Sequence, residues 1–494
     1  MESQNNSTSD VTTNLTFGDL GGKLPLYEKI GYGFGDTASN IMYHAWGVFL
    51  MIFYTDVFGI PAKTAGFMIL VTRIWDMIND PMMGMIADRT KTRWGKFRPY
   101  LLWMAIPYGV LMYVMFITPA WSQNWKVFYA YATYILTTMA YTAINIPYSS
   151  LMAVMTPNPL ERTTLSQYRF FLAFAGKLLV SVFTLPLVMF FGANASLPGF
   201  DEELGYSQAA GFSRTMGAFG IIAIVFLFIT FLTTRERVQP PKDQRSSFRQ
   251  DLADVSKNLP WIIIFISAIF WLTHNAIRDG MILYYFKYVN GEGSSIVFRL
   301  PLGTTGLDFD LTTVFLTIGI LGMMTGVLIS TPLKKRYGRK MLMIFFCFAS
   351  VVLGSAFYIL PPEDFILLAV MNFLWSAVAG AMPVFLFAMF SDVTDFHEWK
   401  FGRRATGLVI AGIMFAIKMG LALGGFLLLR LLDVFGYVAN QPQTPEAIRG
   451  IKLLFSVIPA SFVLVSGIIL CFYPINEKLL AKIEVDLKER KSNE

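Results

Sequence analysis

The chain of 494 residues carries 40 Lys and Arg against 33 Asp and Glu, so charged residues make up 15% of it, while 55% are hydrophobic. Its mean hydropathy is +0.53, whereas soluble domains have roughly 25% charged residues. This composition excludes a soluble multi-domain enzyme, a disordered chain and a nucleic-acid-binding protein. Cys347 and Cys471 lie in apolar runs and predict neither a disulfide framework nor a metal site, and no cofactor is expected.

Apolar segments follow one another along the chain, and a membrane helix needs about 20 such residues. We predict twelve spans, at Ile30–Phe58, Ala62–Ala87, Tyr100–Ile117, Trp125–Met155, Leu165–Phe191, Phe212–Leu232, Trp261–Val289, Leu311–Leu333, Met341–Leu360, Phe365–Phe390, Thr406–Leu432 and Leu453–Phe472. The polar segment Met1–Gly22 lacks the apolar stretch of a signal peptide. The fold class is therefore an all-α membrane protein embedded in a lipid bilayer.

Lys and Arg concentrate after the even-numbered spans, as in the segments 89–98, 235–257, 334–340 and 400–404. Because cytoplasmic loops carry the excess of Lys and Arg, these connections and both termini are predicted to be cytoplasmic. The location expected is the cell inner (plasma) membrane. The net charge of +7 then reflects orientation, and nucleic acid is not an expected partner.

The chain repeats itself, because a short basic turn with one glycine follows both span two (residues 88–96) and span eight (residues 334–340). We predict an N-terminal tail (1–28), a six-helix half (29–234), a linker (235–259), a second six-helix half (260–474) and a C-terminal tail (475–494). Parallel repeats of this kind are typical of the major facilitator fold, whose substrate site lies between the halves. Residues 192–211 and 290–310 are interpreted as surface loops, with partial cover of the outer mouth as the alternative.

Ionisable residues within the spans are costly, by about 2.5–3.5 kcal/mol each on insertion scales, and so mark functional sites. Eight stand out: Asp36, Arg73, Asp76, Asp80, Arg169, Arg278, Asp279 and Lys418. Their four cations and four anions could also form structural ion pairs. Arg73, Asp76 and Asp80 share one helical face, with Asn79 beside it. Two carboxylates one turn apart repel each other, so they either share a proton or attract a small cation such as Na⁺.

Several motifs in order resemble the glycoside–pentoside–hexuronide:cation symporter family, in which the melibiose permeases are the best-known members. The matching segments are Tyr32–Asp36, Phe53–Asp56, Arg73–Pro81, Arg93–Pro99, Tyr141–Pro147, Tyr168–Phe171, Ser391–Trp399 and Lys418–Gly420. Together they cover nearly the whole of Lys29–Tyr473. The resemblance implies a major facilitator fold and sugar uptake coupled to H⁺, Na⁺ or Li⁺.

The resemblance also implies roles for single residues. Asp76 and Asp80 match the cation-binding carboxylates, and Asn79 matches a cation-selectivity position. Tyr141, Thr142 and Arg169 match positions at or near the sugar–cation site, and Lys418 matches a position in its polar network. Asn145 stands where the melibiose permeases carry an acid, and Ser149 stands where they carry a tryptophan, so a melibiose-like substrate is not expected.

Loss of that acid at Asn145 lowers the attraction for Na⁺, since affinity follows ligand charge, so we favour H⁺ coupling over Na⁺ coupling. Sugars are held by polar groups and aromatic faces in a mostly apolar cleft. Candidate substrate contacts are Asp36, Asn40, Tyr43, His44, Arg73, Tyr141, Asn145, Arg169, Trp271, His274, Asn275, Arg278, Trp375 and Lys418. Thr142 and Asn145 are also assigned to the cation or proton site, with Asp76, Asn79 and Asp80. Arg278 could hold an anionic substrate or pair with an acid, and we place a neutral pentoside or glycoside ahead of a uronide.

Charged residues on the cytoplasmic side of both halves, Asp88 and Arg93 in one and Asp392, Asp395 and Arg404 in the other, are interpreted as a gate. Solvated loops are the alternative. An enzyme is not expected, because no nucleophile–base pair is visible. A lysolipid carrier of the same fold and a Na⁺-coupled sugar symporter are the competing functions. The protein is expected to act as a monomer.

Overall fold

The computed structural model describes residues 23–156, 158–194, 196–202, 205–237, 257–291, 295–301, 306–402 and 406–493. The first 22 residues of the predicted tail, most of the predicted linker (238–256) and Arg404 lie outside these ranges. The side chain of Asp88 also lies outside the described part.

The first half of the chain, which we call the N-half, is a group of long helices. It comprises α1 (Leu26–Val48), α2 (Leu50–Ile52), the π-helix η1 (Phe53–Val57), α3 (Ala62–Arg89), α4 (Arg98–Trp103), α5 (Ala105–Met115), α6 (Gln123–Met155), α7 (Pro159–Gly192) and α8 (Gln208–Thr233). A two-stranded hairpin of β1 (Phe200–Asp201) and β2 (Tyr206–Ser207) precedes α8. Only Phe49 separates α1 from α2, and only Met104 separates α4 from α5.

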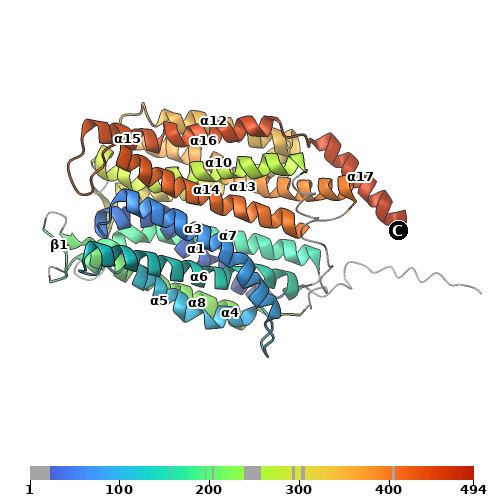
Figure 1. The fold of residues 1–494 in the computed structure, drawn as a ribbon, viewed down its shortest axis with the longest axis horizontal. Helices are drawn as coiled ribbons and strands as arrows, with labels where there is room; N and C mark the ends of the chain where they lie inside the picture. Colours follow the sequence, from blue (N-terminus) through green and yellow to red (C-terminus); the bar gives the residue numbers. More distant parts are fainter. Residues whose placement is uncertain are drawn as a thin grey trace, which may run out of the picture.

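The second half, the C-half, repeats this arrangement (Figure 1). It comprises α10 (Leu259–Tyr285), the π-helix η2 (Phe286–Asn290), β3 (Ile296–Leu300), β4 (Leu307–Asp310), α11 (Leu311–Tyr337), α12 (Arg339–Ala356), α13 (Phe365–Phe401), α14 (Thr406–Val434), α15 (Pro445–Phe455) and α16 (Val457–Cys471). The predicted C-terminal tail contains a further helix, α17 (Glu477–Asn493). The Trp399 indole donates to Asp486 Oδ2 at 2.8 Å, which fixes α17 to the end of α13.

Each of the twelve predicted spans corresponds to one helix or to two or three consecutive helices. Helices suit these apolar runs because a membrane offers backbone groups no partner other than the chain itself. Within the described residues, eight helices are long and apolar enough to cross a membrane by length and composition alone. Helix α3 is not among them, since Arg73, Asp76 and Asp80 lower its apolar character.

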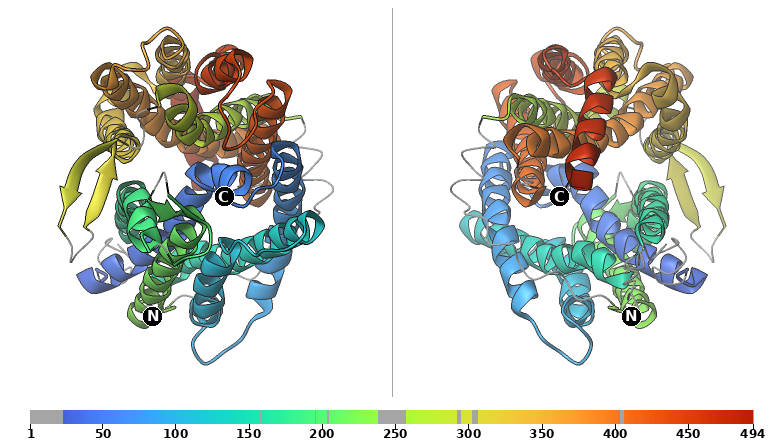
Figure 2. Two further views of the ribbon diagram at one scale, coloured as in Figure 1. Left: turned by 90° about the vertical axis from the view of Figure 1, so that its left-hand side faces the viewer. Right: turned by 90° about the vertical axis from the view of Figure 1, so that its right-hand side faces the viewer.

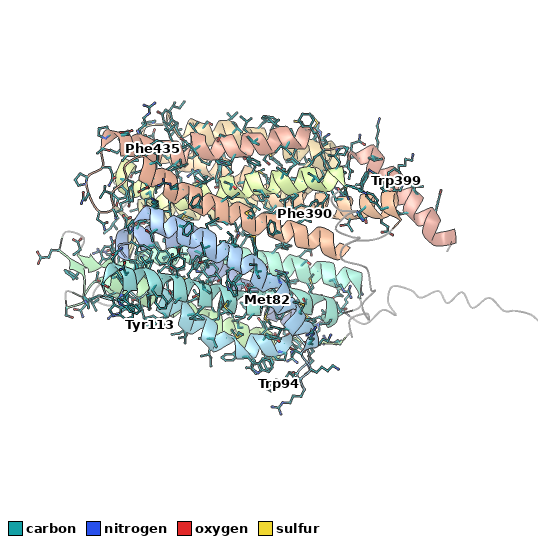
Figure 3. The ribbon with its side chains drawn as sticks, in the orientation of Figure 1. Met82, Trp94, Tyr113, Phe390, Trp399 and Phe435 are labelled. Carbon is teal, nitrogen blue, oxygen red and sulfur yellow. The ribbon has the colours of Figure 1, made fainter. Side chains whose placement is uncertain are left out.

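The two halves lie side by side, and the end views separate them clearly (Figure 2). Contacts between them run mainly through α3 with α14, α7 with α11, and α1 with α10. Trp94 and Trp399 lie toward one end of the bundle and Tyr113 and Phe435 toward the other (Figure 3). We refer to these as the Trp94 end and the Phe435 end.

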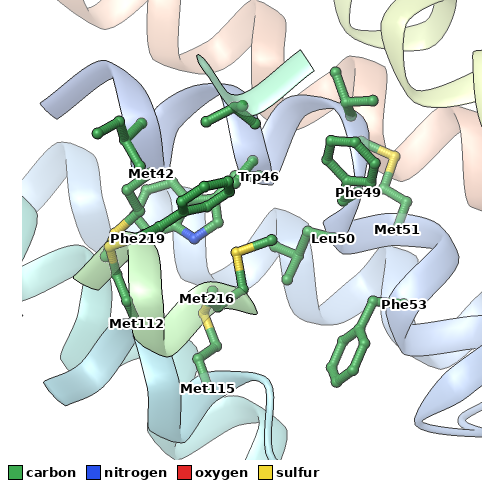
Figure 4. Close-up of a cluster of buried hydrophobic side chains, with 14 of the residues drawn as sticks. Met42, Trp46, Phe49, Leu50, Met51, Phe53, Met112, Met115, Met216 and Phe219 are labelled. Carbon is green, nitrogen blue, oxygen red and sulfur yellow. The ribbon is translucent and has the colours of Figure 1, made fainter. Parts of the chain in front are cut away.

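Aromatic and sulfur-containing side chains fill the interior of the N-half. Trp46, Phe49 and Phe53 from the first span pack against Met112 and Met216 (Figure 4). At the Phe435 end the hairpin β3–β4, which belongs to the C-half, packs on α7 of the N-half. The rings of Phe309 and Phe183 meet there edge to face, 6.4 Å apart. The hairpin β3–β4, which lies in the segment interpreted from sequence as a surface loop, thus forms a bridge between the halves.

Candidate functional site

A cavity of about 350 Å³ lies between the two halves, a size within the range of roughly 300–1,000 Å³ found for small-molecule sites. Its wall combines apolar surface with a few polar side chains. Those polar and aromatic residues are Tyr43, His44, Trp46, Arg73, Tyr134, Lys177 and Ser181 from the N-half, and Trp271, Asn275, Asp279, Asn372, Trp375 and Ser376 from the C-half. Contributions from both halves place the cavity where a substrate could contact both.

Six of the predicted substrate contacts line this cavity: Tyr43, His44, Arg73, Trp271, Asn275 and Trp375. His44 Nε2 lies 2.8 Å from Ser181 Oγ, so α1 and α7 share a hydrogen bond at the wall. The other predicted contacts are not among the lining residues. Apart from Tyr141 and Asn145, which pair with each other, they fall into three separate clusters.

The first cluster joins Asp76 and Asp80 of α3 to Lys418 of α14, across the boundary between the halves. Lys418 Nζ lies 3.0 Å from Asp76 Oδ2 and 2.5 Å from Asp80 Oδ2. The Thr142 hydroxyl, on α6, faces one oxygen of each carboxylate at 3.0 and 3.1 Å. The spacing of four residues on a helix brings the two acids onto one face, and the ammonium group occupies the place between them.

Arg73 connects this cluster to the cavity. Its side chain lines the cavity wall, and Nη1 lies 3.7 Å from Asp76 Oδ2. The guanidinium also lies over the rings of Trp46 and Tyr134, at 5.3 and 5.9 Å from their centres. A charge change at Asp76 therefore acts directly on a residue that a substrate in the cavity would contact.

Asn79 and Asn145 lie apart from the ammonium bridge. Asn79 is buried on α3, but no described hydrogen bond joins it to either carboxylate. Asn145 Nδ2 donates to the Tyr141 hydroxyl at 2.7 Å, and its Oδ1 is buried without a partner. The Tyr141 ring packs on Trp46 with centres 5.6 Å apart. Asn145 and Tyr141 therefore support the cavity wall by packing behind Trp46.

The second cluster is confined to the N-half. Arg169 Nε lies 3.2 Å from Asp36 Oδ2, and the guanidinium lies over the Tyr148 ring at 5.1 Å. Asn40 Nδ2 donates to the Asp36 carbonyl oxygen at 2.9 Å. Asp36 and Arg169 thus neutralise each other between α1 and α7.

The third cluster lies in the C-half, behind the cavity wall. His274 Nδ1 lies 2.8 Å from the Pro459 carbonyl oxygen, so that nitrogen donates. Arg278 is 1% exposed, and its three side-chain nitrogens have no hydrogen-bond partner. Its guanidinium carbon lies 3.5, 4.5 and 5.0 Å from the ring centres of Phe455, Phe357 and Trp375. An aromatic cage therefore holds the Arg278 charge away from the cavity.

Among the predicted gate residues whose contacts are described, neither Asp392 nor Arg93 joins the halves at the Trp94 end. Asp392 forms an ion pair with Arg339, within the C-half. Arg93 is exposed and lies over the Trp94 ring at 4.5 Å. Asp395 is likewise not free, because it also interacts with other groups. Of the described ion pairs at this end, Glu28–Arg237 and Lys29–Glu161 lie within the N-half.

The Phe435 end, in contrast, contains an ion cluster between the halves that the sequence reasoning missed. Asp56, at the end of η1, accepts hydrogen bonds from Lys287 Nζ at 2.5 Å and from the Tyr288 and Tyr437 hydroxyls. Asn440 Nδ2 donates to the Asp56 carbonyl oxygen at 2.5 Å. All four partners belong to the C-half. We call Asp56, Lys287, Tyr288, Tyr437 and Asn440 the Asp56 latch.

A signal for the latch exists in the sequence, because the first and seventh spans each end with a charge of opposite sign. Sequence reasoning also missed Lys177, a single lysine within the apolar run of α7 that lines the cavity. Asp279, which the sequence left unassigned, lines the cavity from α10.

The sequence of the chain matches a known class of proteins. A family model described as "MFS/sugar transport protein" matches residues 31–477. The chain belongs to this family of sugar symporters. It is 36% identical over 466 residues to the "Putative glycoside/cation symporter YagG" of Escherichia coli (strain K12), covering 94% of this chain and 95% of that protein. It is also 36% identical over 447 residues to the "Inner membrane symporter YicJ" of the same organism, covering 90% and 91%.

The solved structure of "nucleoside transporter NupG" shares the fold, with a TM-score of 0.59 at 13% identity over 91% of this chain and 100% of that one. The prediction of a major facilitator fold is confirmed. So is the resemblance to the glycoside–pentoside–hexuronide:cation symporters. This family member is a multi-pass membrane transporter and not an enzyme.

Proposed function

We propose that the protein carries a sugar across the inner membrane together with a cation, which is H⁺ in preference to Na⁺. The observation that carries the proposal is the Asp76–Lys418–Asp80 bridge beside the cavity. Paired carboxylates at the interface of two halves suit a cation that enters and leaves during each transport cycle, and intramembrane acids of this kind often act in proton relays.

Lys418 acts here as a tethered cation. A proton on either carboxylate would remove one ion pair and release the ammonium group, whereas Na⁺ would need several oxygen ligands. The described oxygens beside the bridge are those of two carboxylates and of Thr142, and Asn145 contributes no carboxylate. This ligand set favours a proton. Arg73 then transmits the change from Asp76 to the cavity.

Alternating access is supported by the contrast between the two ends. At the Phe435 end the Asp56 latch and the β3–β4 hairpin join the halves. At the Trp94 end the described ion pairs stay within one half. With the basic turns on the cytoplasmic side, this arrangement corresponds to a carrier closed toward the outside, with Asp392, Asp395 and Arg93 as gate residues of the opposite state. The proposal includes cytoplasmic termini and keeps the domain limits predicted from the sequence.

The test is sugar counterflow and gradient-driven uptake in proteoliposomes, with a panel of radiolabelled pentosides, glycosides and uronides. Wild-type protein is expected to accumulate its sugar under a pH gradient without Na⁺. Asp76→Asn should abolish accumulation but retain counterflow, because Asp76 itself does not line the sugar cavity. Asp433→Asn, which alters an exposed pair with Arg430, is the matched control and should behave as wild type.

Accumulation that requires a Na⁺ gradient would replace H⁺ with Na⁺ as the coupling ion. Full gradient-driven accumulation by Asp76→Asn would reject the carboxylate bridge as the coupling site. Exchange of a lysophospholipid in place of every sugar would reject sugar transport itself.

A further inference from the structure

Lys177 places an unpaired ammonium group at the wall of the central cavity. It lies on α7 in the N-half, partly exposed and among the cavity-lining residues. No described hydrogen bond or ion pair involves its Nζ, which lies 5.5 Å from the centre of the Phe174 ring. Ser181 lies one helical turn further on the same face and binds His44 at the wall. This corner of the cavity therefore presents a positive charge beside a hydroxyl and an imidazole.

The balance of charge within the spans leaves one positive charge without compensation. When Lys177 is added to the eight ionisable residues identified within the spans, the set contains five cations and four anions. The set identified from the sequence contains four of each. Asp36 neutralises Arg169, and Asp76 and Asp80 neutralise Arg73 and Lys418. Lys177, Arg278 and Asp279 remain, and they carry a net charge of +1.

Of the two remaining cations, a substrate can reach only Lys177. Arg278 is 1% exposed and lies in its cage of Phe357, Trp375 and Phe455. An unpaired charge in a low-dielectric site is costly unless it gains a partner. Because Lys177 lines the cavity, a substrate bound there can supply its partner.

Asp279 gives the opposite wall a different chemistry. It lines the cavity from α10 in the C-half, with Asn275 one turn earlier on the same face. Asp279 and Lys177 interact electrostatically but form no ion pair. A carboxylate and an amide are acceptors and donors for sugar hydroxyls, and the carboxylate would repel a second negative charge on the substrate.

We propose that the cavity binds a monoanionic sugar, whose acidic group is held by Lys177 and whose hydroxyls are held by Asp279 and Asn275. The inference rests on the proposed function and deepens it. The proposed substrate is anionic, whereas the sequence favoured a neutral one. The residue proposed to bind its acidic group is Lys177 and not Arg278. A carboxylate and a sulfonate share the chemistry that this corner recognises, since each offers charged oxygens to an ammonium group.

The experiment compares substrates that differ only at the acidic group. Counterflow is measured for methyl β-D-glucuronide, methyl 6-deoxy-6-sulfo-glucoside and the neutral methyl β-D-glucoside, and the galacto series repeats the comparison. The variants are Lys177→Gln, which removes the charge, and Lys177→Arg, which keeps it. Lys63→Gln, at an exposed position on α3, is the control.

Wild type is expected to prefer an anionic member by at least about tenfold, the scale of one charge-assisted hydrogen bond. Lys177→Gln should remove that preference and leave exchange of the neutral member within about twofold. Lys177→Arg and Lys63→Gln should keep the preference. Comparing the uronide with the sulfonate identifies which acidic group is the substrate's.

Preferred exchange of the neutral member by wild type would overturn the inference while leaving the proposed function intact. Equal loss of anionic and neutral exchange in Lys177→Gln would also overturn it, because Lys177 would then act structurally. Exchange of no member in either series, together with exchange of an unrelated solute, would reject both the inference and the proposed function.

Discussion

Replacing Asp56 by asparagine tests how strongly the latch holds the Phe435 end closed. The Asp56 side chain is 1% exposed and Lys287 is 32% exposed. The carboxylate accepts from Lys287, Tyr288 and Tyr437 of the opposite half. Asparagine keeps the shape and the hydroxyl contacts but removes the charge, so the Lys287 ammonium retains Asn440 Oδ1, at 2.6 Å, as its remaining described partner.

The loss of stability of the closed state in Asp56→Asn can be worked out from these contacts. Breaking a buried ion pair costs about 3–5 kcal/mol, and water around the partly exposed Lys287 recovers a share, so we expect a loss of about 2–4 kcal/mol for the closed state. Because 1.4 kcal/mol is tenfold, the ratio of closed to open protein should fall by roughly 30- to 700-fold.

The assay is a distance measurement between spin labels at Lys63 in the N-half and Gln441 in the C-half, both exposed and both near the latch. Cys471 is exposed and is replaced by serine, whereas Cys347 is buried and stays. Asp56→Asn should shift the distance distribution to longer values. Asp433→Asn, whose pair with Arg430 is 41% exposed on both sides, should not. An unchanged distribution in Asp56→Asn would refute the latch.

Two further predictions concern stability. A Cβ at Gly326 on α11 would lie 1.8 Å from the Ala377 carbonyl oxygen on α13, so Gly326→Ala should lower the unfolding temperature by several degrees, while Gly84→Ala, with open surroundings, should not. Burial raises the pKa of Asp310, which caps α11, to about 6 from 3.8. The folded state therefore binds the proton more tightly, and its stability falls as pH rises from about 4 to 6, by about 3 kcal/mol in total. Asp310→Asn should raise the unfolding temperature at pH 7.5 but not at pH 4. A gain for Asp310→Asn that is the same at both pH values would contradict the assignment.

The fold and part of the site could be predicted from local patterns. Apolar runs define the spans because the bilayer acts on each segment separately, and the spacing of Asp76 and Asp80 places both acids on one face of α3 without knowledge of any other helix. The position of Lys418 between them could be expected only from the resemblance, since 338 residues separate it from Asp80.

The other site residues could not be placed from local patterns, because their contacts depend on tertiary packing. Asp36 and Arg169, both expected at the substrate, prove to neutralise each other, and Arg278 lies in an aromatic cage rather than in the cavity. Pairing of this kind depends on how α1, α7 and α10 rotate about their axes, which no single span determines. Lys177 was overlooked although it could have been found, because it is a charge within a predicted span, the same signal that identified Arg169 and Lys418.

The ammonium bridge between Asp76 and Asp80 has a consequence for the membrane potential. With Arg73 included, the two cations and two anions sum to zero, so voltage does no net work on this group when the empty carrier reorients. A charge that crosses the membrane gains or loses about 2.3 kcal/mol per 100 mV. For this group, the electrical driving force therefore acts on the step that carries the coupling cation inward, and the empty group adds no voltage dependence to the return step.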